Sequence, residues 1–211
     1  MSDKGISMAV VKRLPRYYRY LGELLENGVV RISSKELSEK MNVTASQIRQ
    51  DLNNFGGFGQ QGYGYNVEFL HQEIGKILGL DHEYHVIILG VGNLGQALSK
   101  YAGFRRNGFV VKALFDINED IIGKKFGNAT VYSMDELENY IKNNEVHIAV
   151  MTLPKEAAPQ VAKQVVDWGV KAIWNFVSTD LQLPEGVVFE NVHLAESLMR
   201  LSYSIKRSNE D

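Results

Sequence analysis

The spacing of apolar residues divides this chain into two parts. Up to about residue 80, apolar residues recur every three or four positions, which is typical of amphipathic helices. Beyond residue 85, continuous apolar runs alternate with helical stretches, which predicts a doubly wound parallel sheet with helices on its faces. We therefore predict an α/β protein with domains at residues 1–81 and 82–192, followed by a terminal helix at residues 193–211.

The first part has the signals of a winged helix-turn-helix domain. A helix is predicted over residues 9–27, ended by Gly28. Ser33-Ser34-Lys35-Glu36 and Thr44-Ala45-Ser46-Gln47 are both capping boxes, each starting a short helix. The tight turn at residues 42–43 between these helices completes a helix-turn-helix pattern.

The second short helix has an apolar side and a polar side. Ala45, Ile48 and Leu52 share the side expected to be buried. The outward side chains are of the types that bond base edges or phosphates in a major groove, although an ordinary surface helix has similar ones. We predict DNA contacts from Ser46, Gln47, Arg49 and Gln50.

A glycine-rich segment with aromatic residues follows at residues 55–65. It predicts a hairpin with Phe58, Tyr63 and Tyr65 at its base and Gln60-Gln61 at a tip that enters a minor groove. Gln60, Gln61 and Tyr63 are predicted DNA contacts. A flexible linker is the alternative, but linkers seldom contain three large aromatic side chains. Residues 66–80 are predicted to form a helix that bridges the two domains, with its apolar residues, Ile77 among them, facing inward.

Residues 86–116 form a dinucleotide-binding fingerprint. The apolar run Val86–Leu89 leads into the sequence Gly90-Val91-Gly92-Asn93-Leu94-Gly95. A helical stretch and a second apolar run follow, and Asp116 ends that run 21 residues after Gly95. Strand, glycine turn, helix, strand and acid stand in the order that this fingerprint requires.

Each glycine of the fingerprint has its own expected task. Gly90 permits the tight turn, Gly92 lets the backbone approach a pyrophosphate, and Gly95 lets the helix pack near the sheet. Asp116 can accept hydrogen bonds from both ribose hydroxyls and would repel a 2′-phosphate, which favours NAD(H) over NADP(H). A close-packed turn that binds no nucleotide is the alternative. We predict cofactor contacts from all six residues of the loop, Gly90, Val91, Gly92, Asn93, Leu94 and Gly95, and from Asp116.

The later segments predict the rest of the sheet. Strands are expected at residues 130–133 (an edge strand), 146–152, 171–176 and 187–191, with helices at 134–142 and from Pro154 to about 168. Ligands of such sheets bind at the carboxyl ends of the strands. We therefore predict cofactor contacts from Thr152, Leu153, Pro154 and Asn175, while turn chemistry explains Thr152 and Asn175 equally well.

Composition limits the functions that remain. The chain has 211 residues and no cysteine, so thiol redox chemistry is excluded. Residues 1–60 hold nine Lys and Arg against six Asp and Glu, although the net charge of the chain is −2. Arg13 and Arg16 lie in a cationic stretch without acids, which favours a DNA-binding first domain, although a solvated helix face explains it as well. We predict DNA contacts from both residues. Without a signal-peptide pattern or a long apolar run, we expect a cytoplasmic protein that binds no membrane. We predict no metal site and no catalytic residue.

Taken together, these segments resemble the Rex family of redox-sensing transcriptional repressors along nearly the whole chain. The segments that match are KRLPRYYRYL (12–21), RISSKELSEKMNVTASQIRQDLNNFG (31–56), GQQGYGYNVEFL (59–70), VIILGVGNLGQAL (86–98), FDIN (115–118), MTLPKEAA (151–158), KAIWNF (171–176) and ENVHLAESLMRLSY (190–203).

The resemblance implies a homodimer that represses transcription. Each dimer would bind a palindromic, AT-rich operator, hold NAD(H) and release DNA when NADH binds. It implies that Tyr101 lies beside the nicotinamide. Spacing alone leaves open whether the apolar stripe Leu194, Leu198, Leu201 and Ile205 closes the core of its own domain or packs on a partner chain. The resemblance implies that this C-terminal helix is swapped between protomers. The family commonly has aspartate where this chain has His193, which places a carboxylate-based switch in doubt.

Two other functions are compatible with parts of the pattern. An NAD-dependent oxidoreductase would need an acid–base group at the nicotinamide, but the chain contains no Tyr-x-x-x-Lys pair. A DNA-binding regulator could sense another nucleotide such as coenzyme A, whose 3′-phosphate Asp116 disfavours. We therefore expect a regulator rather than an enzyme.

Overall fold

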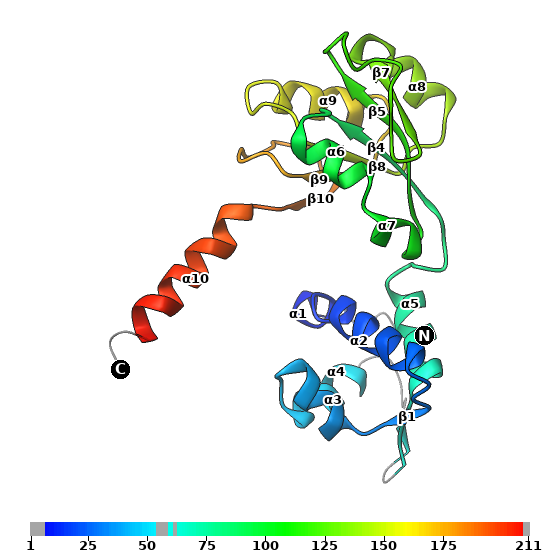
Figure 1. The fold of residues 1–211 in the computed structure, drawn as a ribbon, viewed down its shortest axis with the longest axis vertical. Coiled ribbons are helices and arrows are strands. Elements are labelled where there is room, and N and C mark those ends of the chain that lie inside the picture. The colour runs from blue at the N-terminus through cyan, green and yellow to red at the C-terminus, as the bar shows by residue number, and fades with distance from the viewer. Residues whose placement is uncertain (1–6, 54–58, 61–62, 209–211) are drawn as a thin grey trace. The chain divides into compact units, whose positions relative to one another are not determined.

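The computed structural model describes residues 7–53, 59–60 and 63–208 (Figure 1). Contacts between Cα atoms divide the chain into two compact units, Met1–His82 and Glu83–Asp211. The first is a winged helix-turn-helix and the second a Rossmann-like parallel sheet, so the predicted fold class is confirmed.

The first unit packs its helices around one apolar core. Its helices are α1 (Met8–Val11), α2 (Leu14–Glu26), α3 (Ser34–Met41), α4 (Ala45–Asn53) and α5 (Val67–Ile77). A small antiparallel sheet has the order β1-β3-β2, from β1 (Arg31–Ile32), β2 (Gly59–Gln60) and β3 (Gly64–Asn66). Leu14, Leu21, Leu37, Ile48 and Leu70 are fully buried in this core, because each lies on the apolar side of its helix.

The prediction of a single helix over residues 9–27 is wrong. The chain forms α1 and α2 instead, with a break at Lys12-Arg13. Pro15 explains the break, because proline has no N–H to bond the carbonyl of Val11 and its ring crowds that carbonyl. Proline is well tolerated in the first turn of the new helix, where Pro15 lies.

The capping signals place α3 and α4 where the sequence predicts them. The Ser33 hydroxyl accepts from the Glu36 N–H at 3.1 Å, and the Glu36 carboxylate accepts from the Ser33 N–H at 2.8 Å. These bonds lower the pKa of Glu36. Asn42 ends α3 in the left-handed conformation, with a φ of 52°. At α4, the Thr44 hydroxyl accepts from the Gln47 N–H at 3.1 Å, but the Gln47 side chain is directed to another partner.

The glycine-rich hairpin is described only in part. Phe58 and Gln61 lie outside the described residues, and the position of Gln60 is known only as part of β2. Tyr65 packs into the core of the first unit, whereas 68% of Tyr63, also predicted at the base of the hairpin, is exposed. After the hairpin, α5 ends at Ile77 and packs against α2 within the first unit. Ile77 was predicted to be inward, but 38% of it is exposed.

The second unit is built on a seven-stranded sheet with the order β10-β9-β8-β4-β5-β7-β6. Its strands are β4 (Tyr84–Leu89), β5 (Phe109–Asp116), β6 (Lys125–Phe126), β7 (Ala129–Ser133), β8 (Ile148–Met151), β9 (Ala172–Asn175) and β10 (Val188–Asn191). All pairings are parallel except that of β6 with β7. Apolar clusters form around the sheet, one including Ile87 and Phe115 and the other Ile88 and Leu114, because neighbouring strand residues point to opposite faces.

The connecting segments differ from the predictions in several places. The strand at residues 129–133 is not the edge strand, since β6 pairs outside it. The helix after Pro154 is α9 (Ala158–Asp167) and begins later than predicted, because residues 155–157 form turns. The other helices are α6 (Asn93–Ser99), α7 (Ala102–Arg106), α8 (Leu137–Asn143), which follows a 3₁₀ turn at Met134–Glu136, and α10 (Leu194–Ser208).

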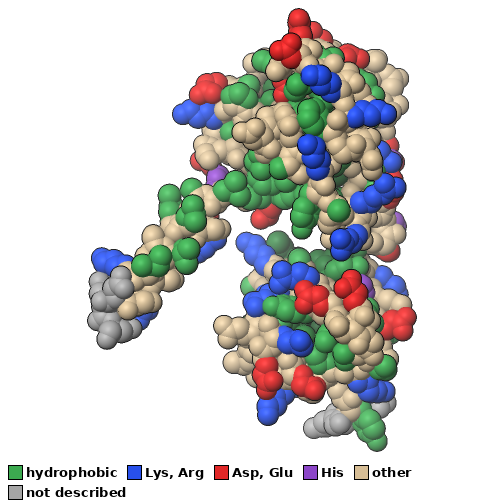
Figure 2. Space-filling view, in the orientation of Figure 1, with side chains coloured by type: hydrophobic (Ala, Val, Ile, Leu, Met, Phe, Trp, Pro, Cys, Tyr) green, Lys and Arg blue, Asp and Glu red, His purple; other side chains and the backbone are tan. Residues whose placement is uncertain are grey.

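The terminal helix α10 has no buried residue. Its exposed fractions are 61% for Leu194, 68% for Leu198, 55% for Leu201 and 55% for Ile205. Figure 2 shows the hydrophobic side chains gathered along this helix. Among the helices that the structure describes, none is both long and apolar enough to cross a membrane.

Candidate functional site

The predicted cofactor residues follow four neighbouring parallel strands. The register pairs Leu89 with Phe115 and with Met151, and Met151 with Asn175. The carboxyl ends of β5, β4, β8 and β9 are therefore aligned side by side. The chain continues from β4 to β5 on one side and returns through β8 to β9 on the other, so β4 and β8 flank the switch point where such sheets bind ligands.

The glycines of the fingerprint differ in the space around them. Gly90 has a φ of +92°, and a Cβ built there would lie 2.6 Å from the Thr152 carbonyl oxygen. A Cβ at Gly95 would lie 2.1 Å from the Gly90 carbonyl oxygen. A Cβ at Gly92, by contrast, meets no atom within 4 Å. Packing within the protein explains Gly90 and Gly95, whereas Gly92 borders an open space.

Asp116 connects the acid of the fingerprint to its loop. Its Oδ2 accepts from the Val91 N–H at 2.6 Å, and its Oδ1 accepts from the Asn118 N–H at 2.9 Å. The carboxylate remains partly exposed at the end of β5. This geometry places the acid directly beside the glycine loop, as a ribose-binding residue requires.

The segment after β8 closes the other side of the loop. The Thr152 hydroxyl donates to the carbonyl oxygens of Leu89 at 3.0 Å and Gly90 at 2.7 Å. Thr152 and Leu153 are half-buried and Pro154 is exposed. The hydroxyl of Thr152 thus holds the glycine turn in shape, and cofactor contact by these three residues stays a prediction.

The Asn175 side chain is bonded within the protein. It is fully buried, and its amide nitrogen donates to the carbonyl of Val177 at 3.1 Å and to Oδ1 of Asn191 at 2.9 Å. Its Oδ1 accepts from the Val177 N–H at 3.0 Å. These bonds support the turn chemistry that was the alternative reading of this residue, and contact with a cofactor stays a prediction.

An aromatic cluster that the sequence did not single out adjoins Tyr101. Tyr101 lies 4.9 Å from Phe104 between ring centroids, Phe104 lies 5.5 Å from Trp174, and Trp174 lies 4.5 Å from Phe176. This chain of rings connects Tyr101, which is 62% exposed, to the carboxyl end of β9. The sequence could have revealed this cluster, because Phe104, Trp174 and Phe176 lie within a few positions of the predicted contacts Tyr101 and Asn175.

The predicted DNA-reading residues lie on α4. Ser46, Arg49 and Gln50 are exposed and Gln47 is half-buried, whereas Ile48 and Leu52 belong to the core. Arg49 donates to the Ser34 hydroxyl at 3.0 Å, which connects α4 to α3.

Arg13 binds a buried carboxylate that sequence reasoning missed. Its Nε and Nη2 donate to the two carboxylate oxygens of Asp51, each at 2.7 Å. The hydroxyl of Tyr17 donates to Asp51 at 2.8 Å, and so does the Gln47 amide. Burial alone would raise the pKa of Asp51, but these bonds lower it below its usual value. DNA contact by Arg13 stays a prediction, and its guanidinium has this structural partner.

The remaining predicted DNA contacts are surface residues or are not described. Arg16 is exposed, and its guanidinium lies 5.8 Å from the ring centroid of Tyr20. The Tyr63 ring is exposed, and the backbone carbonyl of Tyr63 accepts from Arg31 at 3.2 Å.

One histidine cluster has the composition of a metal site. The ligand atoms of His85, Glu145 and His147 lie within 4.8 Å of one another. The Nδ1 of His147 accepts the His85 N–H at 2.9 Å, which places the His147 proton on Nε2, beside Glu145 at 3.4 Å. His85 lies between carboxylates of Glu83 at 3.2 Å and Glu145 at 3.5 Å. Hydrogen bonds to neighbouring backbone and carboxylate groups therefore account for this cluster.

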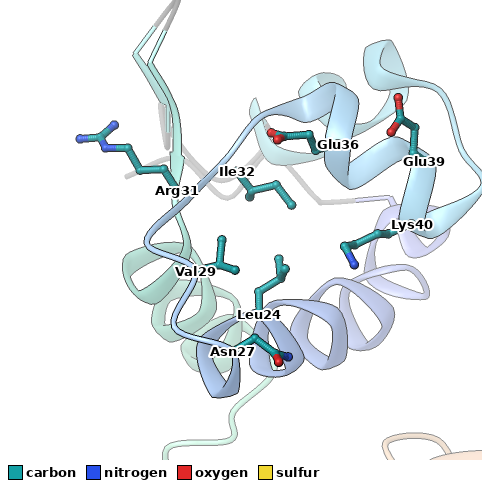
Figure 3. Close-up of a pocket in the computed structure, with 8 residues that line it drawn as sticks. All are labelled: Leu24, Asn27, Val29, Arg31, Ile32, Glu36, Glu39 and Lys40. Carbon is teal, nitrogen blue, oxygen red and sulfur yellow. The ribbon is translucent and has the colours of Figure 1, made fainter.

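A cavity of about 580 Å³ is lined by residues of the first unit, whereas the predicted cofactor residues all belong to the second (Figure 3). Leu24, Val29 and Ile32 line it together with charged side chains, Glu36 and Lys40 among them. Glu36 is already bonded in the capping box of α3. The mixed lining offers no fingerprint for a nucleotide.

Comparisons with known proteins agree with both units. Residues 5–53 match a family model described as "Putative DNA-binding protein N-terminus", and residues 81–179 match one described as "CoA binding domain". The chain is 59% identical to a redox-sensing transcriptional repressor Rex of Clostridioides difficile (strain 630), covering 98% of both chains. It is 56% identical to the Rex of Thermoanaerobacter sp. (strain X514), covering 97% of this chain and 92% of that one.

Solved structures agree over the same length. A crystal structure of RSP with beta-NAD+ and operator DNA has a TM-score of 0.91 and 54% identity, covering 97% of this chain and 94% of that chain. A crystal structure of RSP with beta-NADH has a TM-score of 0.89 and 51% identity, covering 98% and 97%. The two relatives from Clostridioides difficile and Thermoanaerobacter are named as transcriptional repressors. The chain therefore belongs to the Rex family of redox-sensing transcriptional repressors.

Proposed function

We propose that this chain represses transcription as a homodimer that binds NAD(H) through Gly90–Gly95 and Asp116 and releases operator DNA when NADH binds. The observation that supports this most directly is the contrast between Gly92, with open space where a Cβ would lie, and its two tightly packed neighbours in the fingerprint. The RSP structures with NAD⁺, NADH and operator DNA support the same ligands.

The residues at the strand ends fit a dinucleotide. Gly92 leaves room for a diphosphate against the loop backbone, and the Asp116 carboxylate beside Val91 can accept from ribose hydroxyls. No cation follows Asp116 at Ile117 or Asn118 to hold a ribose phosphate. This favours NAD(H) over NADP(H) and over coenzyme A, although the matched model for this region is described as CoA-binding.

The nicotinamide ring supplies the redox signal, because its positive charge is lost on reduction. Tyr101 and its neighbouring aromatic rings lie near the end of β9 and offer a stacking surface for this ring. A preference for NADH alters DNA binding only if the two dimer states differ in their affinity for NADH. His193, half-buried just before α10, stands where the family commonly has aspartate, and we assign it no part in the switch.

On the DNA side, α4 enters the major groove with Ser46, Gln47, Arg49 and Gln50. Arg13, Arg16 and the hairpin residues Gln60, Gln61 and Tyr63 bind the flanking backbone and minor groove of an AT-rich palindrome. A homodimer brings two such helices to successive half-sites. The uncovered apolar side of α10 forms the dimer contact by exchange between protomers. A repressor acts where the bacterial chromosome lies, which places the protein in the cytoplasm.

Operator binding measured during separate titrations with NADH and NAD⁺ tests this function. We expect NADH to weaken binding of the full-length protein to an AT-rich palindrome by roughly 5- to 150-fold, the usual range of allosteric coupling, and NAD⁺ to leave it intact. The operator must weaken NADH binding by the same factor. Operator affinity that does not respond to NADH would contradict the proposal.

A further inference from the structure

A buried carboxylate lies directly behind the DNA-reading side of α4. No part of Asp51 is exposed, and its oxygens accept from three different side chains. Arg13 and Tyr17 reach it from the start of α2, whereas Gln47 reaches it from one turn earlier in α4. Gln47 is the only one of these three donors within α4 itself.

The carboxylate selects one orientation of the Gln47 amide. Nε2 of Gln47 donates to Oδ1 of Asp51 at 2.8 Å. The reversed amide would place its carbonyl oxygen against a carboxylate oxygen, so the bond would be lost and two acceptors would repel each other. In the retained orientation, Oε1 and the second amide hydrogen remain for partners other than Asp51.

This arrangement also explains the incomplete second capping box. Thr44 accepts the Gln47 N–H at 3.1 Å, as a capping residue does. The Gln47 side chain, however, extends to Asp51 instead of completing the box. The residue thus starts the helix with its backbone and leaves its half-buried side chain positioned in the first turn, the part of a recognition helix that contacts base edges.

An amide in this orientation distinguishes adenine from guanine. In the major groove adenine presents an N6 amino donor beside the N7 acceptor, which match a carbonyl oxygen and an amide hydrogen. Guanine presents two acceptors, O6 and N7, and O6 would face the Gln47 oxygen. An unrestrained glutamine can turn its amide to suit either base more easily than a restrained one.

We propose that Asp51 is a positioning residue for operator recognition, which holds the Gln47 amide so that it reads an adenine and rejects guanine. This inference rests on the proposed entry of α4 into the major groove. It assigns Asp51 no DNA contact of its own.

The experiment uses the full-length protein and an operator that it enriches from a randomised duplex pool. Each adenine of a half-site is replaced in turn by purine, which keeps N7 and lacks the N6 amino group, and affinities are measured by fluorescence anisotropy. At one adenine position in each half-site, we expect the replacement by purine to lower the affinity of the wild type about tenfold. Gln47→Met should abolish the penalty at that position and leave the other positions unchanged.

Asp51→Ala and Tyr17→Phe form the matched pair that tests positioning. Asp51→Ala removes both carboxylate oxygens and with them the Gln47 bond, whereas Tyr17→Phe removes one donor to Asp51 and leaves the Gln47 bond in place. We expect the purine penalty to fall several-fold and guanine to be better tolerated in Asp51→Ala, while Tyr17→Phe keeps the wild-type discrimination. A folded Asp51→Ala protein with wild-type discrimination would overturn the inference.

A measurement on the wild type covers the case in which Asp51→Ala does not fold. Nuclear magnetic resonance of the Gln47 side-chain amide should show slower hydrogen exchange than in the unfolded chain, because one hydrogen is bonded to a buried acceptor. Exchange as fast as in the unfolded chain would also overturn the inference. If the wild type enriches no operator, the proposed function fails. If it binds an operator whose purine series is unaffected by Gln47→Met, only this inference fails.

Discussion

The two units of the molecule differ in how far each one completes its own packing. In the first unit, the apolar sides of α2, α4 and α5 meet in one core. Even the buried Asp51 has its negative charge balanced by Arg13, and its oxygens accept hydrogen bonds from neighbouring side chains. In the second unit, the sheet is covered on both faces, yet α10 exposes its apolar side and the glycine loop leaves open space at Gly92. Helices with similar amphipathic sequences therefore differ in burial: the apolar sides of α2, α4 and α5 are buried in a core, and that of α10 is exposed.

This difference separates residues that maintain the fold from residues that await a partner. A side chain or glycine with all its neighbours in place is explained by stability. An uncovered apolar side, or a glycine such as Gly92 that has open space beside it and no positive φ, is explained by a ligand or a second chain. Substitutions that act on one class and spare the other test this distinction.

The largest effect is expected at α10. Leu198→Glu together with Leu201→Glu places charge on the uncovered stripe and should dissociate the dimer. A monomer reads one half-site only, so operator affinity should fall at least a hundredfold through lost bivalency. Deletion of residues 193–211 should do the same. Sedimentation equilibrium and operator titration measure the two outcomes.

The control for α10 is Arg207→Glu, which changes charge on the opposite side of the helix. It should leave the dimer intact. A stable dimer in the double Leu variant would show that the apolar stripe serves another purpose and would break the comparison between the units.

The second prediction contrasts two glycines of one loop. Gly90→Ala should destabilise the second unit by about 3 kcal/mol, because its φ is positive and its Cβ would meet the Thr152 carbonyl. Gly92→Ala should leave stability nearly unchanged but weaken NADH binding. Denaturant unfolding followed by the fluorescence of Trp168 and Trp174, both in the second unit, measures stability. Equal losses of stability in both variants would contradict the distinction.

The third prediction concerns Asp116. Asp116→Ala should weaken NADH binding roughly tenfold, about 1.4 kcal/mol, through lost charge-assisted hydrogen bonds. The affinity for NADPH should fall less, because the variant also removes the repulsion between the Asp116 carboxylate and the 2′-phosphate of NADPH. Asp120→Ala removes the same charge from an exposed position nearby and is the control. If titration of NADH and NADPH fluorescence gives an unchanged ratio of affinities, another residue selects the cofactor.

Local signals in the sequence predicted most of the fold. Three of these signals depend on residues only a few positions apart, so the sequence itself shows them: the Ser33 capping box, the turn at Asn42 and the glycine fingerprint. The break before α2 was legible too, since Pro15 is incompatible with a continuous helix. The untested DNA and cofactor contacts remain predictions.

Long-range competition accounts for what the sequence did not predict. Gln47 leaves its capping box because Asp51 lies one turn away, and Asp51 is buried because Arg13 and Tyr17 arrive from 38 and 34 residues earlier. Asn175 similarly bonds Asn191, 16 residues later. Spacing within α4 places Asp51 beside Gln47, but it contains no information about the distant partners that bury Asp51 or that bond Asn175.

The smallest expected effect tests whether the first unit tolerates a charge in its packing. His71 stacks on Tyr18 with ring centroids 4.0 Å apart, and burial lowers its pKa below the ordinary 6.5. Between that lowered pKa and 6.5, the unfolded chain binds more protons than the folded one, so stability is greatest above pH 6.5 and falls as the pH drops through this window. Hydrogen exchange of amides in α2 and α5, measured on both sides of pH 6.5, should show a modest increase in opening at the lower pH. His71→Gln should reduce that pH dependence, whereas His82→Gln, at an exposed position, should retain it. Identical pH dependence in the wild type and His71→Gln would mean that protonation of the His71 ring does not lower the stability of the first unit.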